Sequence, residues 1–237
     1  MIPKVVYQSW YTREFHPIVQ DKLDAMKVLN PEYQFVLYTD DEMDAFVNEQ
    51  YPGEIADAYN RLNIVVAKVD FWRYLVLYTY GGIYLDIDSD IRVPFREWIQ
   101  ETDQAILSAE QNQFKFVQWA LVFSKGHPIL KQTIDAVVRN IQINRFPNDI
   151  CKMTGPYPFT EGILYTHYAY FQEVLDHTKI TTETDITYSN KDVSYRILGI
   201  DYSPYLAFKY DECFYLYIQK NHWHYEQSEK DLLKKIE

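Results

Sequence analysis

The chain has 237 residues, of which 47% are hydrophobic and 24% are charged, a composition typical of a globular protein. Its 34 acidic and 23 basic residues give a formal net charge of −11. This balance argues against nucleic acid and against an anionic membrane surface as partners, because both need a basic patch. Any phosphate site must therefore be local, built from a metal ion and a few basic residues.

The cysteines and the start of the chain bear on its compartment. A chain of this size with only two cysteines, Cys151 and Cys213, is expected to be a reduced intracellular protein. The first residues lead directly into a strand pattern without a signal peptide, and no run of about 18 uncharged apolar residues predicts a transmembrane helix. We therefore expect a cytoplasmic protein. The sequence leaves its oligomeric state open.

The first 60 residues alternate between strand and helix patterns. The predicted elements are a strand at Val5–Gln8, a helix at Pro17–Leu29, a strand at Tyr33–Tyr38, a helix that begins with the capping box Thr39–Glu42, and a short helix at residues 54–60. This order predicts a Rossmann-like α/β domain with parallel strands.

The next stretch carries the candidate chemistry. Ile64 to Tyr80 is apolar almost all round a helical wheel, which predicts a buried helix that ends at Gly81-Gly82. Within it Asp70 and Arg73 are three residues apart, so one face presents an acid and a base together. A short buried strand, Ile83–Leu85, is expected to follow.

Three acids, Asp86, Asp88 and Asp90, come after that strand at alternate positions. Alternate side chains of an extended chain project to one side, so the first two carboxylates should lie together and Asp90 should continue the row. Two carboxylates at the end of a strand suit a hard divalent cation, Mn²⁺ or Mg²⁺, that keeps positions open for phosphate. A solvated turn is the alternative interpretation.

These residues resemble the core signature of sugar-nucleotide glycosyltransferases with a DXD motif. The matching positions are Ala67, Asp70, Arg73, Tyr74 and Gly81-Gly82-Ile83-Tyr84-Leu85-Asp86-Ile87-Asp88. The subgroup that they resemble is glycosyltransferase family 32, which includes yeast-type initiating α-1,6-mannosyltransferases and bacterial capsule transferases and is related to clostridial glucosylating toxins. The opening Ile2–Trp10 resembles the first strand of that family, with Tyr7 in place of a histidine. The resemblance is strong over residues 2–95 and thin beyond them.

The resemblance implies a GT-A fold, a single α/β domain over residues 1–237 with a mixed central sheet flanked by helices. Residues 1–95 would bind the nucleotide sugar, and residues 96–237 would form the acceptor-side half and a closing C-terminal segment. The implied donor-binding residues are Val6, Gln8, Trp10, Ala67, Asp70, Arg73, Gly82, Tyr84, Asp86, Ile87 and Asp88.

The resemblance also assigns roles within this set. Trp10 would stack on the nucleotide base, although a tryptophan that covers the sheet edge is an equally good interpretation. Asp70 and Arg73 would bind the hydroxyls of the donor sugar. The alternative for that pair is a buried ion pair that holds the helix in place.

The second half of the chain gives weaker patterns. Strands are predicted at residues 105–109 and 117–123, and a helix from Gly126-His127-Pro128 through Asn140, with His127 in a structural role. Thr154-Gly155-Pro156 resembles a segment that lies beside the sugar in relatives. Residues 179–215 are expected to form acceptor-side walls.

The end of the chain is expected to complete the site. A last strand is predicted at residues 215–218, and Ser228 is expected to cap a final short helix. By resemblance the metal ligands are Asp86 and Asp88 with Asn221 or His222, the choice between these two being open, and the catalytic residues are Asp70, Arg73, Asp86, Asp88 and Trp223. The match is partial, because no tryptophan follows in Glu226-Gln227-Ser228.

The implied activity is that of a metal-dependent, retaining glycosyltransferase that moves a sugar from a UDP- or GDP-sugar to a glycan or another hydroxyl acceptor. No carboxylate can be assigned as a covalent nucleophile, which favours front-side attack by the acceptor, and the setting would be polysaccharide or protein-linked glycan synthesis. Two alternatives stay open: a metal-dependent nucleotidyltransferase, which ordinarily has a glycine-rich basic first loop, and a non-catalytic carbohydrate-binding protein. The sugar, the acceptor and the linkage are open.

Overall fold

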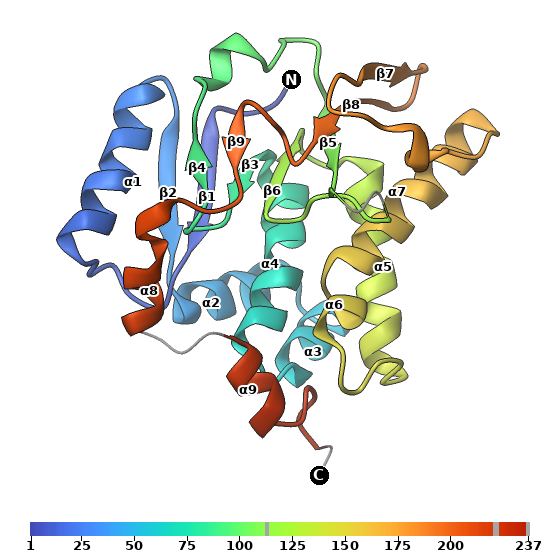
Figure 1. Ribbon diagram of the computed structural model, residues 1–237. Coiled ribbons are helices and arrows are strands. Elements are labelled where there is room, and N and C mark those ends of the chain that lie inside the picture. Colours follow the sequence, from blue (N-terminus) through green and yellow to red (C-terminus); the bar gives the residue numbers. More distant parts are fainter. Residues whose placement is uncertain (112–113, 220–222, 236–237) are drawn as a thin grey trace.

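The computed structural model describes residues 1–111, 114–219 and 223–235 (Figure 1). Its strands are β1 (Val5–Ser9), β2 (Gln34–Tyr38), β3 (Gly82–Leu85), β4 (Asp90–Ile91), β5 (Ala105–Ala109), β6 (Ala120–Phe123), β7 (Asp185–Ser189), β8 (Ser194–Ile200) and β9 (Leu206–Ala207). Its α-helices are α1 (Pro17–Leu29), α2 (Asp40–Gln50), α3 (Glu54–Arg61), α4 (Val65–Tyr80), α5 (Pro128–Gln142), α6 (Ile150–Met153), α7 (Pro156–Phe171), α8 (Phe214–Gln219) and α9 (Trp223–Glu229).

One seven-stranded sheet runs through the molecule in the order β2-β1-β3-β6-β5-β8-β7. β1 pairs in parallel with β2 and β3, whereas β6 is antiparallel to both β3 and β5. β8 pairs in parallel with β5 and antiparallel with β7, and β4 and β9 form a separate antiparallel ribbon. The expected parallel order therefore holds for the first three strands only. The expected α/β fold with a mixed sheet is confirmed.

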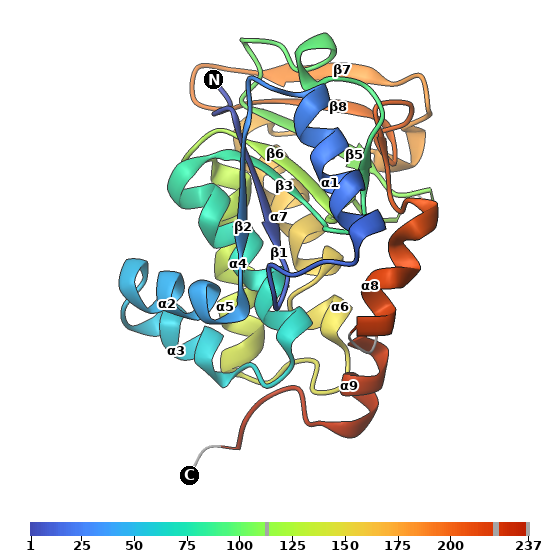
Figure 2. The ribbon, with the colours of Figure 1, turned by 90° about the vertical axis from the view of Figure 1, so that its left-hand side faces the viewer.

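The two faces of the sheet pack against different helices (Figures 1 and 2). Since strand side chains alternate between faces, neighbouring residues enter separate cores. The set that packs with α1 includes Val6, Ile83, Val122 and Leu198. The set that packs with α4, α5 and α7 includes Tyr7, Tyr84, Leu121 and Ile197. The result is a three-layer arrangement with α4 buried against the sheet.

Local signals explain where the elements of the first half begin and end. The capping box that starts α2 is present, with Thr39 and Glu42 bonded to each other's backbone N–H groups. Gly81 ends α4 with φ +69°, and Gly82 follows with φ +116°, both in the region that favours glycine. A Cβ on Gly82 would lie 2.7 Å from the Val5 carbonyl oxygen. The glycine pair therefore ends the helix and lets β3 lie against β1.

The structure corrects three expectations for the second half. Residues 215–218, which were expected to form a strand, belong to helix α8. The helix buries Leu216 completely and places Tyr217 at the candidate site. This packing outweighs the preference of an aromatic run for a strand. Ser228 lies in the last turn of α9 and caps no later helix in the described chain. β6 begins at Ala120, three residues later than expected.

Two further findings concern the expected compartment. Cys151 and Cys213 are both free thiols. No helix in the described ranges is long and apolar enough to cross a membrane.

Candidate active site

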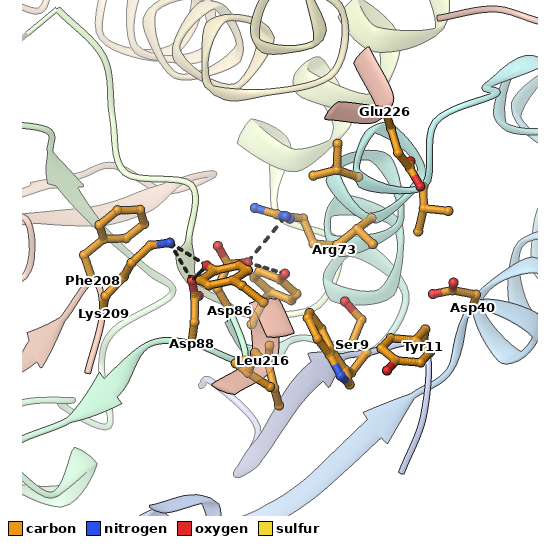
Figure 3. A pocket seen from close by; sticks show the side chains of 17 residues that line it. Ser9, Tyr11, Asp40, Arg73, Asp86, Asp88, Phe208, Lys209, Leu216 and Glu226 are labelled. Atoms are coloured by element: carbon orange, nitrogen blue, oxygen red, sulfur yellow. Dashed lines mark hydrogen bonds and ion pairs between the residues drawn. The ribbon is translucent and has the colours of Figure 1, made fainter. Parts of the chain in front are cut away.

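A pocket of about 420 Å³ lies past the carboxyl ends of β1 and β3, the edge at which open α/β sheets bind ligands (Figure 3). One wall, which we call the pocket floor (residues 65–89), comprises α4, β3 and the turn after it. The opposite wall, the pocket rim (residues 206–217), comes from β9 and α8 at the far end of the chain. The end of β1, the start of α2 and Glu226 of α9 complete the lining.

The DXD acids lie in a tight turn and not in the extended row that was expected. The Ser89 N–H donates to the Asp86 carbonyl oxygen at 3.0 Å, which closes the turn around Asp86 and Asp88. Both acids line the pocket. Asp90 leaves the row, because its carboxylate pairs with Lys22 of α1 at 2.8 Å. The turn thus presents two carboxylates to the pocket.

Arg73 connects the core helix to this turn. Its guanidinium lies 3.1 Å from a carboxylate oxygen of Asp70 and 3.5 Å from one of Asp86, and it stacks 4.4 Å from the ring centre of Tyr84. It also donates to the Gln118 carbonyl oxygen at 3.0 Å. Its Nε is buried and has no hydrogen-bond partner among the described residues. One arginine therefore holds two acids and keeps a donor unused.

Asp70 lies behind Arg73 and is not part of the pocket lining. Its two carboxylate oxygens accept from Gln118 at 3.1 Å and from the Thr154 hydroxyl at 3.0 Å. Burial raises the pKa of Asp70, against the opposite effect of Arg73 and these two hydrogen bonds. The geometry makes Asp70 a buried support for Arg73, and it gives Thr154 a place beside that acid.

Burial also perturbs the first DXD acid. It raises the pKa of Asp86 to about 6, and the neighbouring charge of Asp88 acts in the same direction, whereas Arg73 opposes it. Tyr84 donates its hydroxyl proton to Asp86, and burial raises the pKa of Tyr84 well above its usual value. Two acids that repel each other inside a pocket form a site that favours a cation.

The rim supplies a cation to the second DXD acid. Lys209 Nζ lies 3.0 Å from an oxygen of Asp88, and the hydroxyl of Tyr217 donates to the same oxygen. Lys209 also donates to the Tyr217 hydroxyl at 2.5 Å. Figure 3 shows the DXD acids with Arg73 on one side and Lys209 on the other.

The donor set fits a divalent metal of the Mg²⁺ or Mn²⁺ type. Within the described residues no group of three or more His, Cys, Asp and Glu side chains could hold a metal ion. Asp86 and Asp88 nevertheless place two carboxylates in one pocket, and such ions bind through one or two carboxylates together with water and substrate phosphates. Asp88 already holds a cation, the ammonium of Lys209, which shows that the position attracts positive charge.

The structure sorts the expected donor-binding residues into two groups. Those that line the pocket are Trp10, Arg73, Tyr84, Asp86, Ile87 and Asp88. Those that are buried beside or beneath it are Val6, Gln8, Ala67, Asp70 and Gly82. Asn221 and His222 lie outside the described residues, and so does the side chain of Trp223, although its backbone opens α9.

Several lining residues were not expected from the sequence. They are Ser9, Tyr11, Asp40, Val65, Val66, Val69, Phe208, Lys209, Leu216, Tyr217 and Glu226. Asp40 was expected only as part of the capping-box segment Thr39–Glu42. The position of Tyr11, one residue after Trp10, was an available signal. Nothing local marks Lys209, which reaches the site only through tertiary structure.

Comparison with known proteins finds a family match for part of the chain. Residues 18–105 match the family described as "Glycosyltransferase sugar-binding region containing DXD motif". The chain is 34% identical over 165 residues to inositol phosphoceramide mannosyltransferase 3 of Schizosaccharomyces pombe, covering 65% of this chain and 43% of that protein. It is 24% identical over 218 residues to the initiation-specific alpha-1,6-mannosyltransferase of Candida albicans, covering 75% and 55%. The chain spans about half the length of these curated relatives.

The fold agrees with these matches. The solved structure of the PaToxG glycosyltransferase superposes with a TM-score of 0.59 at 20% identity and covers 70% of each chain. The expected resemblance to family 32 is confirmed, since relatives named as mannosyltransferases and a toxin glycosyltransferase fold are both found. Over residues 18–105 the chain is similar to the glycosyltransferases that carry a DXD-containing sugar-binding region.

Proposed function

We propose that the protein is a metal-dependent, retaining glycosyltransferase that moves a sugar from a nucleotide diphosphate sugar to the hydroxyl of a glycan-type acceptor. One observation carries the proposal: a single pocket joins aromatic residues at the end of β1, the guanidinium of Arg73 and the two carboxylates of the DXD turn. This arrangement offers separate places for a base, a sugar and a metal-bound diphosphate.

The nucleotide would bind at the end of β1. Trp10 and Tyr11 line the pocket there, with their ring centres 5.4 Å apart, and offer aromatic faces to a base. The indole Nε1 of Trp10 and the amide Nε2 of Gln8 are both buried without a hydrogen-bond partner among the described residues. Because an unpaired buried donor is costly, both groups would donate a hydrogen bond to the bound nucleotide, which Gln8 would reach from just outside the pocket lining.

The sugar would bind against Arg73. Its unused Nε and its position between Asp70 and Asp86 suit it to donate to sugar hydroxyls from a fixed geometry. Asp70 would act by orienting Arg73, with Thr154 holding the carboxylate in turn. In this arrangement the buried ion pair between Asp70 and Arg73 fixes the guanidinium, and the guanidinium binds the sugar, so the two interpretations of the pair are compatible.

The diphosphate would lie over the DXD turn. The bond between the sugar C1 and the diphosphate oxygen breaks, and its electron pair stays on that oxygen. The acceptor oxygen forms the new bond to C1 on the same face, and its proton passes to the departing phosphate. Asp86 and Asp88 would hold a divalent ion there, which would supply Lewis-acid stabilisation of the leaving charge. Asn221, His222 and Trp223 stay candidates for completing this part of the site.

The relatives favour mannose as the transferred sugar, because both curated relatives reported above are named mannosyltransferases. One of them is named for an inositol phosphoceramide acceptor, which adds a phosphate-bearing glycolipid to the acceptors worth testing. The cytoplasmic location expected from the sequence stays a prediction, which fractionation of the native source would test.

The testing experiment is donor hydrolysis over a panel of UDP- and GDP-sugars that includes GDP-mannose, each with Mn²⁺, Mg²⁺ or EDTA. Release of nucleoside diphosphate from one donor, dependent on metal and abolished by EDTA, is expected. The anomeric configuration of the product, read by NMR with an accepted acceptor, tests retention. No release from any donor, together with no thermal stabilisation by UDP or GDP with metal, would contradict the proposal.

A further inference from the structure

The rim places a lysine where a metal ion is expected. Lys209 Nζ lies 3.0 Å from a carboxylate oxygen of Asp88, with its side chain 34% exposed and that of Asp88 12% exposed. Tyr217 donates its hydroxyl proton to the same oxygen. Asp88 is thus bound by an ammonium group and a neutral phenol from the rim.

The backbone around Lys209 is fixed to the DXD turn. The Tyr210 N–H donates to the Asp88 carbonyl oxygen at 3.1 Å, and the Tyr210 hydroxyl donates to the Ile87 carbonyl oxygen at 3.2 Å. The Ser89 hydroxyl donates to the Phe208 carbonyl oxygen at 2.8 Å. These bonds join rim and floor on both sides of Lys209. Its flexible side chain is therefore the part that is free to change place.

We propose that Lys209 is a resident cation of the DXD site: its ammonium holds Asp88 until a divalent ion displaces it, and the displaced ammonium then binds the donor diphosphate. The proposal rests on the proposed function, because it needs a metal at Asp86 and Asp88 and a diphosphate beside them. It assigns a role to a residue outside the region that matches the family, residues 18–105.

Electrostatics sets the direction of the exchange. An ammonium 3.0 Å from a carboxylate oxygen fills the space in front of that oxygen, where a divalent ion would bind at the shorter distance of about 2.1 Å, so the two cations exclude each other. Without either cation, Asp86 and Asp88 would repel each other in a partly buried pocket. Lys209 removes that cost in the metal-free protein. It therefore makes the empty site more stable and metal binding weaker.

The displaced ammonium stays useful, because the fixed backbone keeps it in the pocket. Lys209 lines the same cavity as Arg73 and the DXD acids, on the side opposite Arg73 (Figure 3). A diphosphate above the turn would then lie between two cationic side chains. The ammonium of Lys209 would donate hydrogen bonds to the oxygen that receives the electron pair of the broken C1–O bond.

The test is a titration of the whole protein with Mn²⁺ alone, in which free Mn²⁺ is followed by electron paramagnetic resonance. In Lys209→Met, Mn²⁺ should bind about tenfold more tightly than in the wild type, because the competing charge is gone. Lys209→Arg, which keeps the charge, should bind Mn²⁺ with an affinity near that of the wild type. Lys22→Met is the matched control, since Lys22 makes a similar ion pair with Asp90, which does not line the pocket.

Turnover should move in the opposite direction from metal affinity. Release of nucleoside diphosphate at saturating Mn²⁺ should fall about 100-fold in Lys209→Met, because one cation on the leaving group is lost. Tighter metal binding with slower turnover supports the proposal, and a purely structural lysine would weaken both. Unchanged or weaker Mn²⁺ binding in Lys209→Met would overturn it, as would an equal gain of affinity in Lys22→Met.

A measurement on the wild type covers the case in which Lys209→Met fails to fold. The rate of acetylation of Lys209, read by mass spectrometry, should rise when Mn²⁺ is added, because the ammonium leaves Asp88. An unchanged rate under saturating Mn²⁺ would overturn the proposal. If the wild type binds no Mn²⁺ at all, both this proposal and the metal dependence of the proposed function are wrong. If Mn²⁺ binds to Lys209→Met with the same affinity as to the wild type, this proposal is wrong, but the metal dependence of the proposed function is not contradicted.

Discussion

The floor and the rim of the pocket are built in different ways. In the floor, β3 is buried along its whole length and α4 buries nine residues, including Asp70 and Arg73. In the rim, Phe208 and Phe214 are each half exposed, and only a few side chains such as Leu216 enter the core. The floor is therefore part of the scaffold. The rim contributes fewer side chains to the core, namely Leu206, Tyr210, Cys213 and Leu216, and a small set of hydrogen bonds joins it to the floor.

This difference predicts how each wall responds to change. A substitution in the floor should cost both stability and ligand binding, because the same side chains serve the core and the site. A substitution in the rim should act mainly on the metal and the donor, since little of the core depends on it. The four predictions that follow test that contrast, from the largest expected effect to the smallest.

Arg73→Met should lower the free energy of unfolding by about 3–5 kcal/mol, because it leaves the carboxylates of Asp70 and Asp86 buried without their cation. Arg196→Met is the matched control, since Arg196 is equally buried, pairs with Asp103 at 2.7 Å and does not line the pocket. Chemical denaturation should show similar losses in both variants, and calorimetry should show loss of donor binding in Arg73→Met alone. Wild-type donor affinity in Arg73→Met would contradict the role of the floor.

Gly82→Ala should cost about 2–3 kcal/mol of stability, because the new Cβ would lie 2.7 Å from the Val5 carbonyl oxygen in a backbone with φ +116°. Gly53→Ala has a similar φ of +96° and nothing within 4 Å of the new Cβ. It should cost only about 1 kcal/mol, from the backbone conformation alone. Equal costs in urea denaturation would mean that β3 is packed less tightly on β1 than the structure shows.

His127 lies in neither wall of the pocket and should make the stability of the protein depend on pH. It is buried, its Nδ1 accepts from the Ile129 N–H, and burial lowers its pKa to about 4. In the unfolded chain His127 takes up a proton near pH 6.5, and in the folded chain it does not. Its contribution to the free energy of unfolding is therefore fully present above that pH and falls as the pH drops towards 4. At pH 5 the loss should be about 2 kcal/mol. His127→Asn keeps a capping oxygen and should remove that part of the pH dependence, whereas an unchanged pH profile would contradict the assignment.

Ser89→Ala should cost about 1 kcal/mol, because it removes one hydrogen bond between floor and rim and leaves the Phe208 carbonyl oxygen without it. Tyr210→Phe removes a comparable bond to the Ile87 carbonyl oxygen and should have an effect of similar size. Both variants should make the rim easier to cleave by limited proteolysis. A loss above about 3 kcal/mol in either variant would place the rim within the core.

The floor was predictable because its signals are local. The apolar wheel of α4, the glycine pair and the spacing of Asp86 and Asp88 lie within one stretch of sequence, and so does the pairing of Asp70 with Arg73. What the sequence missed there is side-chain direction. Matching positions such as Ala67 and Asp70 are buried supports, since a motif marks a position without showing which way its side chain faces.

The rim was not predictable, because its contacts connect distant parts of the chain. Tyr217 bonds to Asp88 across 129 residues, and no local pattern announces that contact. The run of aromatic residues around Tyr217 favoured a strand, and only packing of Leu216 selects the helix. The DXD acids lie between these cases: their place in the pocket was expected, but the turn that presents them, closed by the Ser89 N–H, and the pairing of Asp90 with Lys22 of α1 were not.

The most direct test of the account compares Asp88→Asn with Asp90→Asn in metal-dependent release of nucleoside diphosphate. The two changes remove the same charge two residues apart, but only Asp88 lines the pocket. Asp88→Asn should lower the rate by about 1,000-fold with the fold intact, and Asp90→Asn should stay within about threefold of the wild type. A rate near that of the wild type in Asp88→Asn, or an equal loss in both variants, would contradict a metal site on the DXD turn.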